Sequence, residues 1–253
     1  VLVIHDETTL ACESGTRGFR IGELQMASTS RICGFYKDST PKSYFLIGCS
    51  NTDGLLAGQI APAYKNGKPF DEQTVGIIKE GTGTYTLTNN NNLITGGIRV
   101  MDGKLLVNND VEAARAANLT GGTGYVREGT QIFVFEKAII GGTGNIGGDL
   151  DVYGKLEPGS NGIGTLTLKN FAKEKPVSLY LRPSTVLEFE IESADNYDRL
   201  IVDNELIYYN ILEDFTESDK MPLVKLVFNE NYTYNQGDEF ILITAKAKNS
   251  LYG

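Results

Sequence analysis

The residues of this chain best suited to chemistry are Asp149 and Asp151, which lie two positions apart in a short segment of strand-forming residues. Side chains two apart in a β-strand project from the same face, so both carboxylates share one surface with Tyr153. Two carboxylates at this spacing could share a calcium ion or flank a uronic acid substrate. The simpler interpretation is a solvated strand face. We favour it because the sequence offers no third ligand and no basic catalyst nearby.

The other carboxylates of interest lie further along the chain. Glu188, Glu190 and Glu192 alternate with apolar residues, which predicts an acidic stripe on the solvent side of a strand. Asp198 and Asp203 flank the next strand-like segment and are interpreted as turn residues rather than metal ligands. We therefore predict no catalytic residue, no bound cofactor, and no metal beyond the calcium candidate described above.

Exposed aromatic rings are the usual platforms for binding sugars, and this chain has tyrosines but no tryptophan. Tyr232 and Tyr234 share a face by the same two-residue spacing, and together with Tyr153 they are possible glycan contacts. Tyr208 and Tyr209 form a second candidate pair. The alternative, which we favour, is that Tyr232 and Tyr234 cover the end of the fold.

The numbers and positions of cysteine and histidine limit which disulfides, catalytic triads and zinc sites are possible. The three cysteines, Cys12, Cys33 and Cys49, lie in the first fifth of the chain, and no pair has the CxxC spacing. We interpret them as buried thiols, with one disulfide between neighbouring repeats as the alternative. The single histidine, His5, argues against a histidine-based triad and against a His-rich zinc site.

Composition and charge exclude several classes of function. The 253 residues carry a net charge of −9 and give a pI near 4.8, with lysine and arginine scattered along the chain. Such a surface repels phosphate backbones, so we expect no nucleic-acid partner. No apolar run approaches the length of a membrane span. The start, VLVIHDETTL, reads as a strand and a turn rather than a signal peptide, and we expect a mature or truncated piece of something longer.

The elements that must position these residues are short β-strands separated by glycine. Two segments, Gly81–Val107 and Gly141–Leu168, share one pattern, in which Gly-Thr-Gly precedes an alternating strand. Repetition of one supersecondary unit predicts a stacked solenoid. Because Gly-Gly and Gly-Thr-Gly dominate over hairpin signals, we expect coils with corners and hence parallel strands.

A few segments depart from this pattern. Asp110–Asn118 could form a one- or two-turn helix, and Ala61–Thr74, which contains an Asn-Gly hairpin signal, is predicted to be a protruding loop. Asn89–Asn92 suits a corner loop or an asparagine ladder. Beyond about Tyr209 an acidic, loop-like stretch precedes further apolar strands, and we expect the C-terminal cap there.

The predicted fold is therefore an all-β solenoid forming a single domain over residues 1–253. We divide it into N-terminal coils at 1–74, repeat coils at 75–208, and C-terminal coils with a capping region at 209–253. At about 20–22 residues per coil and ~4.8 Å between strands, we expect roughly 11–12 coils and a length of about 50–55 Å.

The order of the motifs resembles that of bacterial autotransporter passenger domains with autotransporter-associated β-strand repeats. The segments GKLEPG and GTLTL are similar to the Gly-x-Leu-x-Pro-Gly and Gly-Thr-Leu-Thr-Val motifs of that family. The ordered set spans about Val75–Thr244 and reads GTGTYTLT, TGGIRV, GKLLV, GKLEPG, GTLTL, LEFEI, DRLIV and QGDEFILI. The first fifty residues match the family only in style.

The resemblance implies a right-handed, single-stranded parallel β-helix displayed at the bacterial cell surface or secreted beyond the outer membrane. Proteins of this kind commonly serve as adhesins or stalks. We therefore expect a non-catalytic module at an extracellular location. Its partners would be host or matrix glycans or proteins, and the chain would not itself span a membrane.

The alternative is a carbohydrate-active β-helix, either polysaccharide lyase-like or a glycan-binding accessory module. Enzymes of this architecture need several carboxylates and a basic residue on neighbouring coils of one face. A convergent groove of that kind would distinguish the two hypotheses.

Overall fold

The computed structural model describes residues 1–11, 18–34, 43–62, 64–65, 68–69, 75–109, 131–169, 177–208 and 221–246. Every regular element in these ranges is a β-strand. Accordingly, no helix in this part of the chain is long and apolar enough to cross a membrane. The helix expected at residues 110–118 lies outside the described residues.

Two long sheets and two shorter ones account for almost all strands. The nine-stranded sheet contains, in spatial order, β1 (Leu2–Ile4), β4 (Leu24–Met26), β7 (Gly54–Leu56), β12 (Thr84–Leu87), β14 (Gly103–Val107), β16 (Ala138–Gly142), β19 (Lys155–Pro158), β22 (Val186–Ile191) and β25 (Leu223–Phe228). The eight-stranded sheet contains β3 (Gly18–Ile21), β6 (Ser43–Ile47), β11 (Val75–Lys79), β13 (Ile98–Val100), β15 (Gln131–Val134), β18 (Asp149–Val152), β21 (Ser178–Leu181) and β24 (Glu205–Tyr208).

The shorter sheets occupy the third side of the coils. A three-stranded sheet is formed by β2 (Thr9–Ala11), β5 (Arg31–Cys33) and β8 (Gln59–Ala61). A four-stranded sheet is formed by β17 (Asn145–Ile146), β20 (Thr165–Leu168), β23 (Arg199–Val202) and β26 (Ile243–Ala245). The remaining pair, β9 (Tyr64–Lys65) and β10 (Lys68–Pro69), is antiparallel and confirms the hairpin signal between them.

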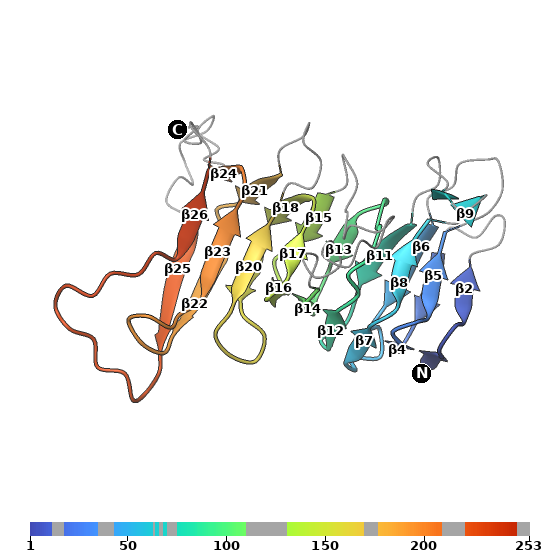
Figure 1. The fold of residues 1–253 in the computed structure, drawn as a ribbon, viewed down its shortest axis with the longest axis horizontal. Helices are drawn as coiled ribbons and strands as arrows, with labels where there is room; N and C mark the ends of the chain where they lie inside the picture. Colours follow the sequence, from blue (N-terminus) through green and yellow to red (C-terminus); the bar gives the residue numbers. More distant parts are fainter. Residues whose placement is uncertain are drawn as a thin grey trace.

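The chain visits the sheets in a repeating order, and this order defines the fold. A strand of the nine-stranded sheet is followed by a strand of a shorter sheet and then by one of the eight-stranded sheet. The exceptions are the coils that begin at β12 and β14, where the described residues contain no strand on the third side. All four sheets are parallel, and the strands stack along the long axis of the molecule (Figure 1). The predicted all-β parallel solenoid is confirmed, and its right-handed sense stays a prediction that follows the usual hand of parallel crossovers.

The predicted number of coils is wrong, because the coils differ greatly in length. Within the described residues the longest sheet has nine strands, rather than eleven or twelve. A step is the sequence separation between register partners on neighbouring strands of this sheet. The shortest step runs from Ile139 to Lys155, and the longest runs from Val186 to Leu223. Most steps take up more residues than the 20–22 expected, so the chain builds fewer coils than predicted.

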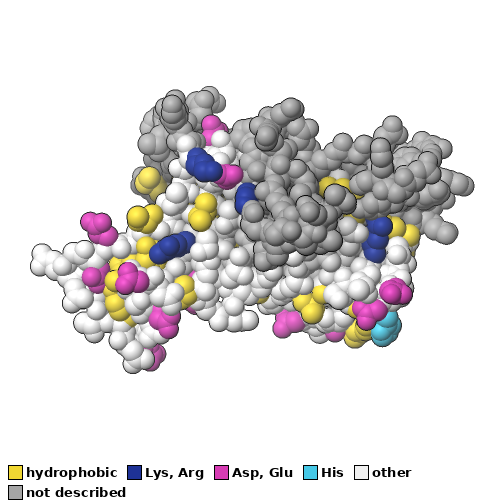
Figure 2. All heavy atoms as spheres, viewed as in Figure 1, with side chains coloured by type: hydrophobic (Ala, Val, Ile, Leu, Met, Phe, Trp, Pro, Cys, Tyr) yellow, Lys and Arg dark blue, Asp and Glu magenta, His cyan; other side chains and the backbone are white. Residues whose placement is uncertain are grey.

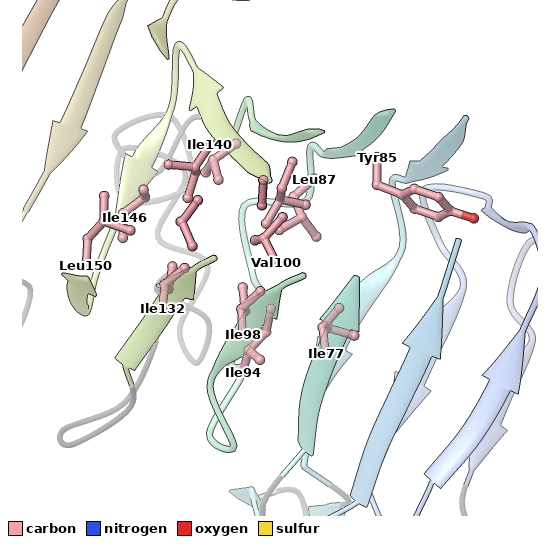
Figure 3. Packing of buried hydrophobic residues seen from close by; sticks show 14 of the residues in the cluster. Ile77, Tyr85, Leu87, Ile94, Ile98, Val100, Ile132, Ile140, Ile146 and Leu150 are labelled. Carbon is pink, nitrogen blue, oxygen red and sulfur yellow. The ribbon is translucent and has the colours of Figure 1, made fainter. Parts of the chain in front are cut away.

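The core is a set of columns of apolar side chains that run from coil to coil. In the eight-stranded sheet, register pairing stacks Ile77, Ile98, Ile132, Leu150 and Leu179, all of them buried. Figure 3 shows the first four of these facing the residues of the opposite sheet across the interior. Because each fully buried aliphatic side chain contributes about 1.5–3 kcal/mol, the columns are the main stabilising feature of the fold.

The corner at Asn89–Asn92 joins neighbouring coils through its side chains. Asn92 Oδ1 accepts the backbone N–H of Ile60 at 2.8 Å, and Asn89 Nδ2 donates to the carbonyl oxygen of Ala57 at 2.8 Å. The segment is therefore a corner, as predicted, and its amides satisfy backbone groups where the third sheet is interrupted.

The described part of the C-terminal section adds one more coil to the stack. In β25, Val224, Leu226 and Phe228 pair with three core residues of β22 that are almost completely buried. Their own exposed fractions are 50%, 38% and 38%. The last row of core side chains is therefore partly open to solvent, and a capping role for this section stays a prediction.

Candidate functional site

Asp151 lies on the outer side of β18, but it is not solvated. Its side chain is only 1% exposed. Arg182 Nε donates to Oδ1 at 2.7 Å and Arg182 Nη2 donates to Oδ2 at 2.5 Å, while Gln131 Nε2 lies 3.3 Å from Oδ2. The expectation of a solvated strand face is therefore wrong for Asp151. Arg182, a basic residue too distant in the sequence to be recognised as a partner, donates hydrogen bonds to both carboxylate oxygens.

Asp149 and Tyr153 belong to the same contact between coils. Asp149 Oδ1 accepts the backbone N–H of Ser178 at 2.9 Å, and the Arg182 guanidinium lies 5.1 Å from the centre of the Tyr153 ring. A calcium ion at this pair would have to displace the two-pronged interaction between Asp151 and Arg182. Nowhere in the described ranges do three or more His, Cys, Asp or Glu residues gather in a way that could hold a metal ion. The geometry supports a structural role that joins two coils.

Charged residues meet instead on the outer face of the nine-stranded sheet. Glu157 of β19 forms ion pairs with Lys104 of β14 and with Lys155, whose Nζ lies 3.4 Å from the carboxylate. Lys155 also lies 3.3 Å from Glu188 of β22, and Lys225 of β25 lies 2.7 Å from the same carboxylate. The hydrogen bond from Lys225, followed by that from Lys155, lowers the pKa of Glu188. We call these five residues the lysine–glutamate ladder.

Two adjoining cavities lie beside the ladder, at the corner between the nine-stranded and four-stranded sheets. The larger, of about 360 Å³, is lined by Lys104, Glu157, Pro158, Gly159, Asn161, Gly162, Glu188, Glu190 and Asp198. The smaller, of about 260 Å³, is lined by Gly162, Ile163, Glu190, Ile191, Glu192, Val227, Phe228 and Asn229. They share Gly162 and Glu190, and together we call them the corner groove. Apolar and acidic side chains lie side by side at this C-terminal end of the molecule (Figure 2, left).

Asp198 forms part of the wall of the larger cavity. Its side chain is 1% exposed, and its oxygens accept the backbone N–H groups of Gly164 and Glu190, each at 2.8 Å. Burial raises its pKa to about 6; the two N–H groups oppose this rise, and the charges of Glu190 and Glu157 add to it. The sequence identified Asp198 only as a turn residue. In the structure it fixes the corner between β22 and β23.

An aromatic cluster borders the smaller cavity. The Phe228 ring lies 6.1 Å from Tyr232, 5.7 Å from Tyr234 and 6.2 Å from Phe240, and Phe240 lies 5.3 Å from Tyr197. Tyr234 is 69% exposed. Tyr232 and Tyr234 therefore both lie beside Phe228, a residue that sequence reasoning overlooked, but they follow β25 and belong to no strand, so the shared strand face expected for them is wrong. The hydrophobic strand LVKLVF, which ends in Phe228 before a polar turn, was the available signal.

The Tyr232 side chain is held at both ends: its ring packs against Phe228, and its hydroxyl is hydrogen bonded to Asp238. Its hydroxyl donates to Asp238 Oδ2 at 2.6 Å, and this hydrogen bond raises the pKa of Tyr232 to about 12. Asp238 Oδ2 also accepts the backbone N–H of Asn235 at 2.8 Å. Tyr232 is therefore a support for the loop and for Phe228, while Tyr234 is the more exposed ring.

Lys79, at the end of β11, is a buried cation that the sequence did not reveal. Its side chain is completely buried, and Nζ donates to the carbonyl oxygens of Glu80, Gly81 and Asp102 at 3.1, 2.6 and 2.9 Å. Burial lowers its pKa to about 8, against the attraction of the Asp102 and Asp53 carboxylates. The ammonium group satisfies three backbone carbonyls at a corner between coils, which is a structural role.

The cysteines agree in part with expectation. Cys33 is a buried free thiol whose pKa is raised by burial, and Cys49 is a partly buried free thiol, so these two form no disulfide. Cys12 lies outside the described residues. His5 is exposed.

Neither a scan against protein-family models nor a search of curated proteins gives a match to this chain. The resemblance to autotransporter passenger domains therefore rests on the order of its motifs.

Proposed function

We propose that this chain is a non-catalytic β-helix module of a bacterial cell-surface or secreted protein, acting as an adhesin-like or stalk-forming passenger. The observation that carries the proposal is the continuous nine-stranded parallel sheet, which runs from β1 to β25. A solenoid in which every coil pairs with its neighbours is a rigid rod with a long exposed surface. Such a rod is suited to display and contact.

The side chains expected to do chemistry support the same proposal. Asp149 and Asp151 hold the coils of β18 and β21 together through Ser178 and Arg182. The lysine–glutamate ladder likewise joins strands of the nine-stranded sheet. Charged groups used in this way stiffen the rod.

The experiment is a binding screen of the purified chain against immobilised matrix proteins and glycans. We expect saturable binding to at least one class, with the bound molecule recovered chemically unchanged. The heat-unfolded chain is the control, and it should lose the binding. Turnover of a bound polymer would contradict the non-catalytic role.

A second candidate, a carbohydrate-active role, is favoured by one specific observation. Asp198, with its pKa raised to about 6, lines the same cavity as Glu157 and Glu190. A carboxyl group with a raised pKa beside other carboxyl groups is typical of the acid in glycoside-cleaving sites.

Its test is a cleavage assay with neutral and uronic acid polysaccharides. If the site is catalytic, Asp198→Asn should abolish cleavage. Asp203→Asn is a matched control, because Asp203 pairs with Lys246 and lines neither cavity of the groove. Absence of cleavage by the unaltered chain would remove this candidate.

A further inference from the structure

We infer that the corner groove binds an amino sugar, with the apolar face of the sugar ring against Phe228 and the ammonium group beside Glu190. The inference deepens the proposed function, on which it rests, by naming the class of ligand that the rod contacts.

The shape of the groove suits a short saccharide. Its larger cavity, of about 360 Å³, falls in the range of small-molecule sites, and the smaller adjoins it. Gly162, where they meet, has a φ of +138°, and a Cβ built there would find no atom within 4 Å. No neighbouring atom therefore crowds Gly162 at the point that the two cavities share.

The aromatic ring that lines the smaller cavity is held in place and partly exposed. Phe228 is 38% exposed, while Tyr232 stacks on it at an interplanar angle of 16° and Phe240 meets it at 71°. A ring fixed by its neighbours loses little freedom when a ligand packs on it. Apolar faces of sugars pack on such rings, which gives Phe228 its role.

The charges decide which saccharide fits. The three lysines of the ladder more than balance the carboxylates of Glu157 and Glu188, and Lys104 also lines the larger cavity. Among the described residues, the lining of the smaller cavity holds acidic residues and no lysine or arginine. Glu190 is exposed, lines both cavities, and forms no ion pair with any lysine or arginine of the described ranges; Glu192 lies beside it in the smaller cavity. Uncompensated negative charge repels uronic acids and attracts a protonated amine. The groove is therefore selective for a cationic sugar.

The test is isothermal titration calorimetry, in which a glucosamine tetramer is added to the folded chain at a pH where the amines of the sugar are protonated. The N-acetylated tetramer and a galacturonic acid tetramer serve as neutral and anionic comparisons. We expect the glucosamine tetramer to bind tightest and the galacturonic acid tetramer not to bind. Tighter binding of the anionic tetramer, or no binding of the glucosamine tetramer, would overturn the inference.

Matched variants separate a specific site from general charge attraction. Glu190→Gln should weaken binding about tenfold, whereas Glu136→Gln, at an exposed acid outside the groove, should leave it unchanged. Phe228→Leu should weaken it about fivefold, whereas Phe135→Leu, at a similarly exposed ring, should not. Equal losses from Glu136→Gln and Glu190→Gln would contradict the inference by showing non-specific attraction.

The outcomes also distinguish this inference from the proposed function. Glu190 is exposed, so its variant tests the site even if Phe228→Leu fails to fold, which a melting curve will show. Binding to a matrix protein without binding to the glucosamine tetramer would contradict the amino-sugar site and leave the surface role standing. If the chain binds neither a matrix protein or glycan nor the glucosamine tetramer, both the proposed surface role and the amino-sugar site are contradicted.

Discussion

Lys79 shows how a single charged residue can belong to the core of a solenoid. Its three acceptors are backbone carbonyls at a corner, and a Cβ at Gly103 would lie 2.6 Å from Nζ. Glycine, whose φ of +62° also suits this position, leaves the space that the ammonium group needs. Lysine and glycine therefore form one structural unit.

Removing the ammonium group should destabilise the fold. Lys79→Met leaves three buried carbonyls without their donor, and we expect a loss of about 2–4 kcal/mol in the free energy of unfolding. Urea denaturation at neutral pH measures this loss. A variant as stable as the unaltered chain would contradict the role assigned to Lys79.

The stabilising effect of Lys79 should also depend on pH. Its pKa is about 8 in the folded chain and 10.5 as the reference for the unfolded one. Between these values the unfolded state binds more protons, so the contribution of Lys79 to stability rises as pH increases through this window. The difference in unfolding free energy between the unaltered chain and Lys79→Met should therefore grow between pH 8 and pH 10.5. A difference that shrinks would contradict the direction of the shift.

The pair of Asp151 and Arg182 gives a second prediction for single residues. Asp151→Asn removes the charge of a buried carboxylate that accepts two hydrogen bonds from the Arg182 guanidinium, and it replaces one of the two acceptor oxygens with an amide nitrogen. We expect a loss of about 3 kcal/mol, measured by chemical denaturation. Glu136→Gln, at an exposed site, is the control and should change stability by less than about 0.5 kcal/mol. Added calcium should not restore the free energy of unfolding of the Asp151→Asn variant.

At the scale of elements, the close approach of neighbouring strands depends on glycine at particular positions. Gly141 in β16 faces the backbone of β19, where a Cβ would lie 2.2 Å from the carbonyl oxygen of Glu157. Lys104 of β14 reaches Glu157 across this position. The absence of a side chain at Gly141 thus permits both the sheet and the ladder.

Gly141→Ala should therefore separate two strands locally. We expect it to destabilise the chain by about 2 kcal/mol or more, because backbone rather than a flexible side chain must move. Thr86→Ala, on the outer face of β12 in the same sheet, should change the free energy of unfolding by less than about 0.5 kcal/mol. Equal melting temperatures for the two variants would contradict the close contact.

The sequence predicts local features of the elements better than relations between coils. Alternation in Thr84–Leu87 is a local signal, and the strand that it predicts is present; Gly141, which the sequence placed at a corner, lies instead within β16. The groove is different, because Glu157, Asp198 and Phe228 come from three coils of unequal length. Their meeting depends on the register between coils, which no local pattern encodes. The partner of Asp151 was missed for the same reason.

At the scale of the whole molecule, the stack of coils is one continuous body with a distinct C-terminal end. The core columns and the nine-stranded sheet run through all three sections of the chain. The groove, the aromatic cluster and the exposed last row of core side chains gather at the end near β25. We propose that the stack of coils gives rigid support along its length and makes its contacts near this end.

The measurement that tests this account most directly is titration of the folded chain with the glucosamine tetramer, followed by analysis of the recovered sugar. The account predicts saturable binding that Glu190→Gln weakens and Glu136→Gln does not, with the tetramer recovered intact. Recovery of cleaved sugar, with cleavage lost in Asp198→Asn, would contradict it and identify the groove as an active site.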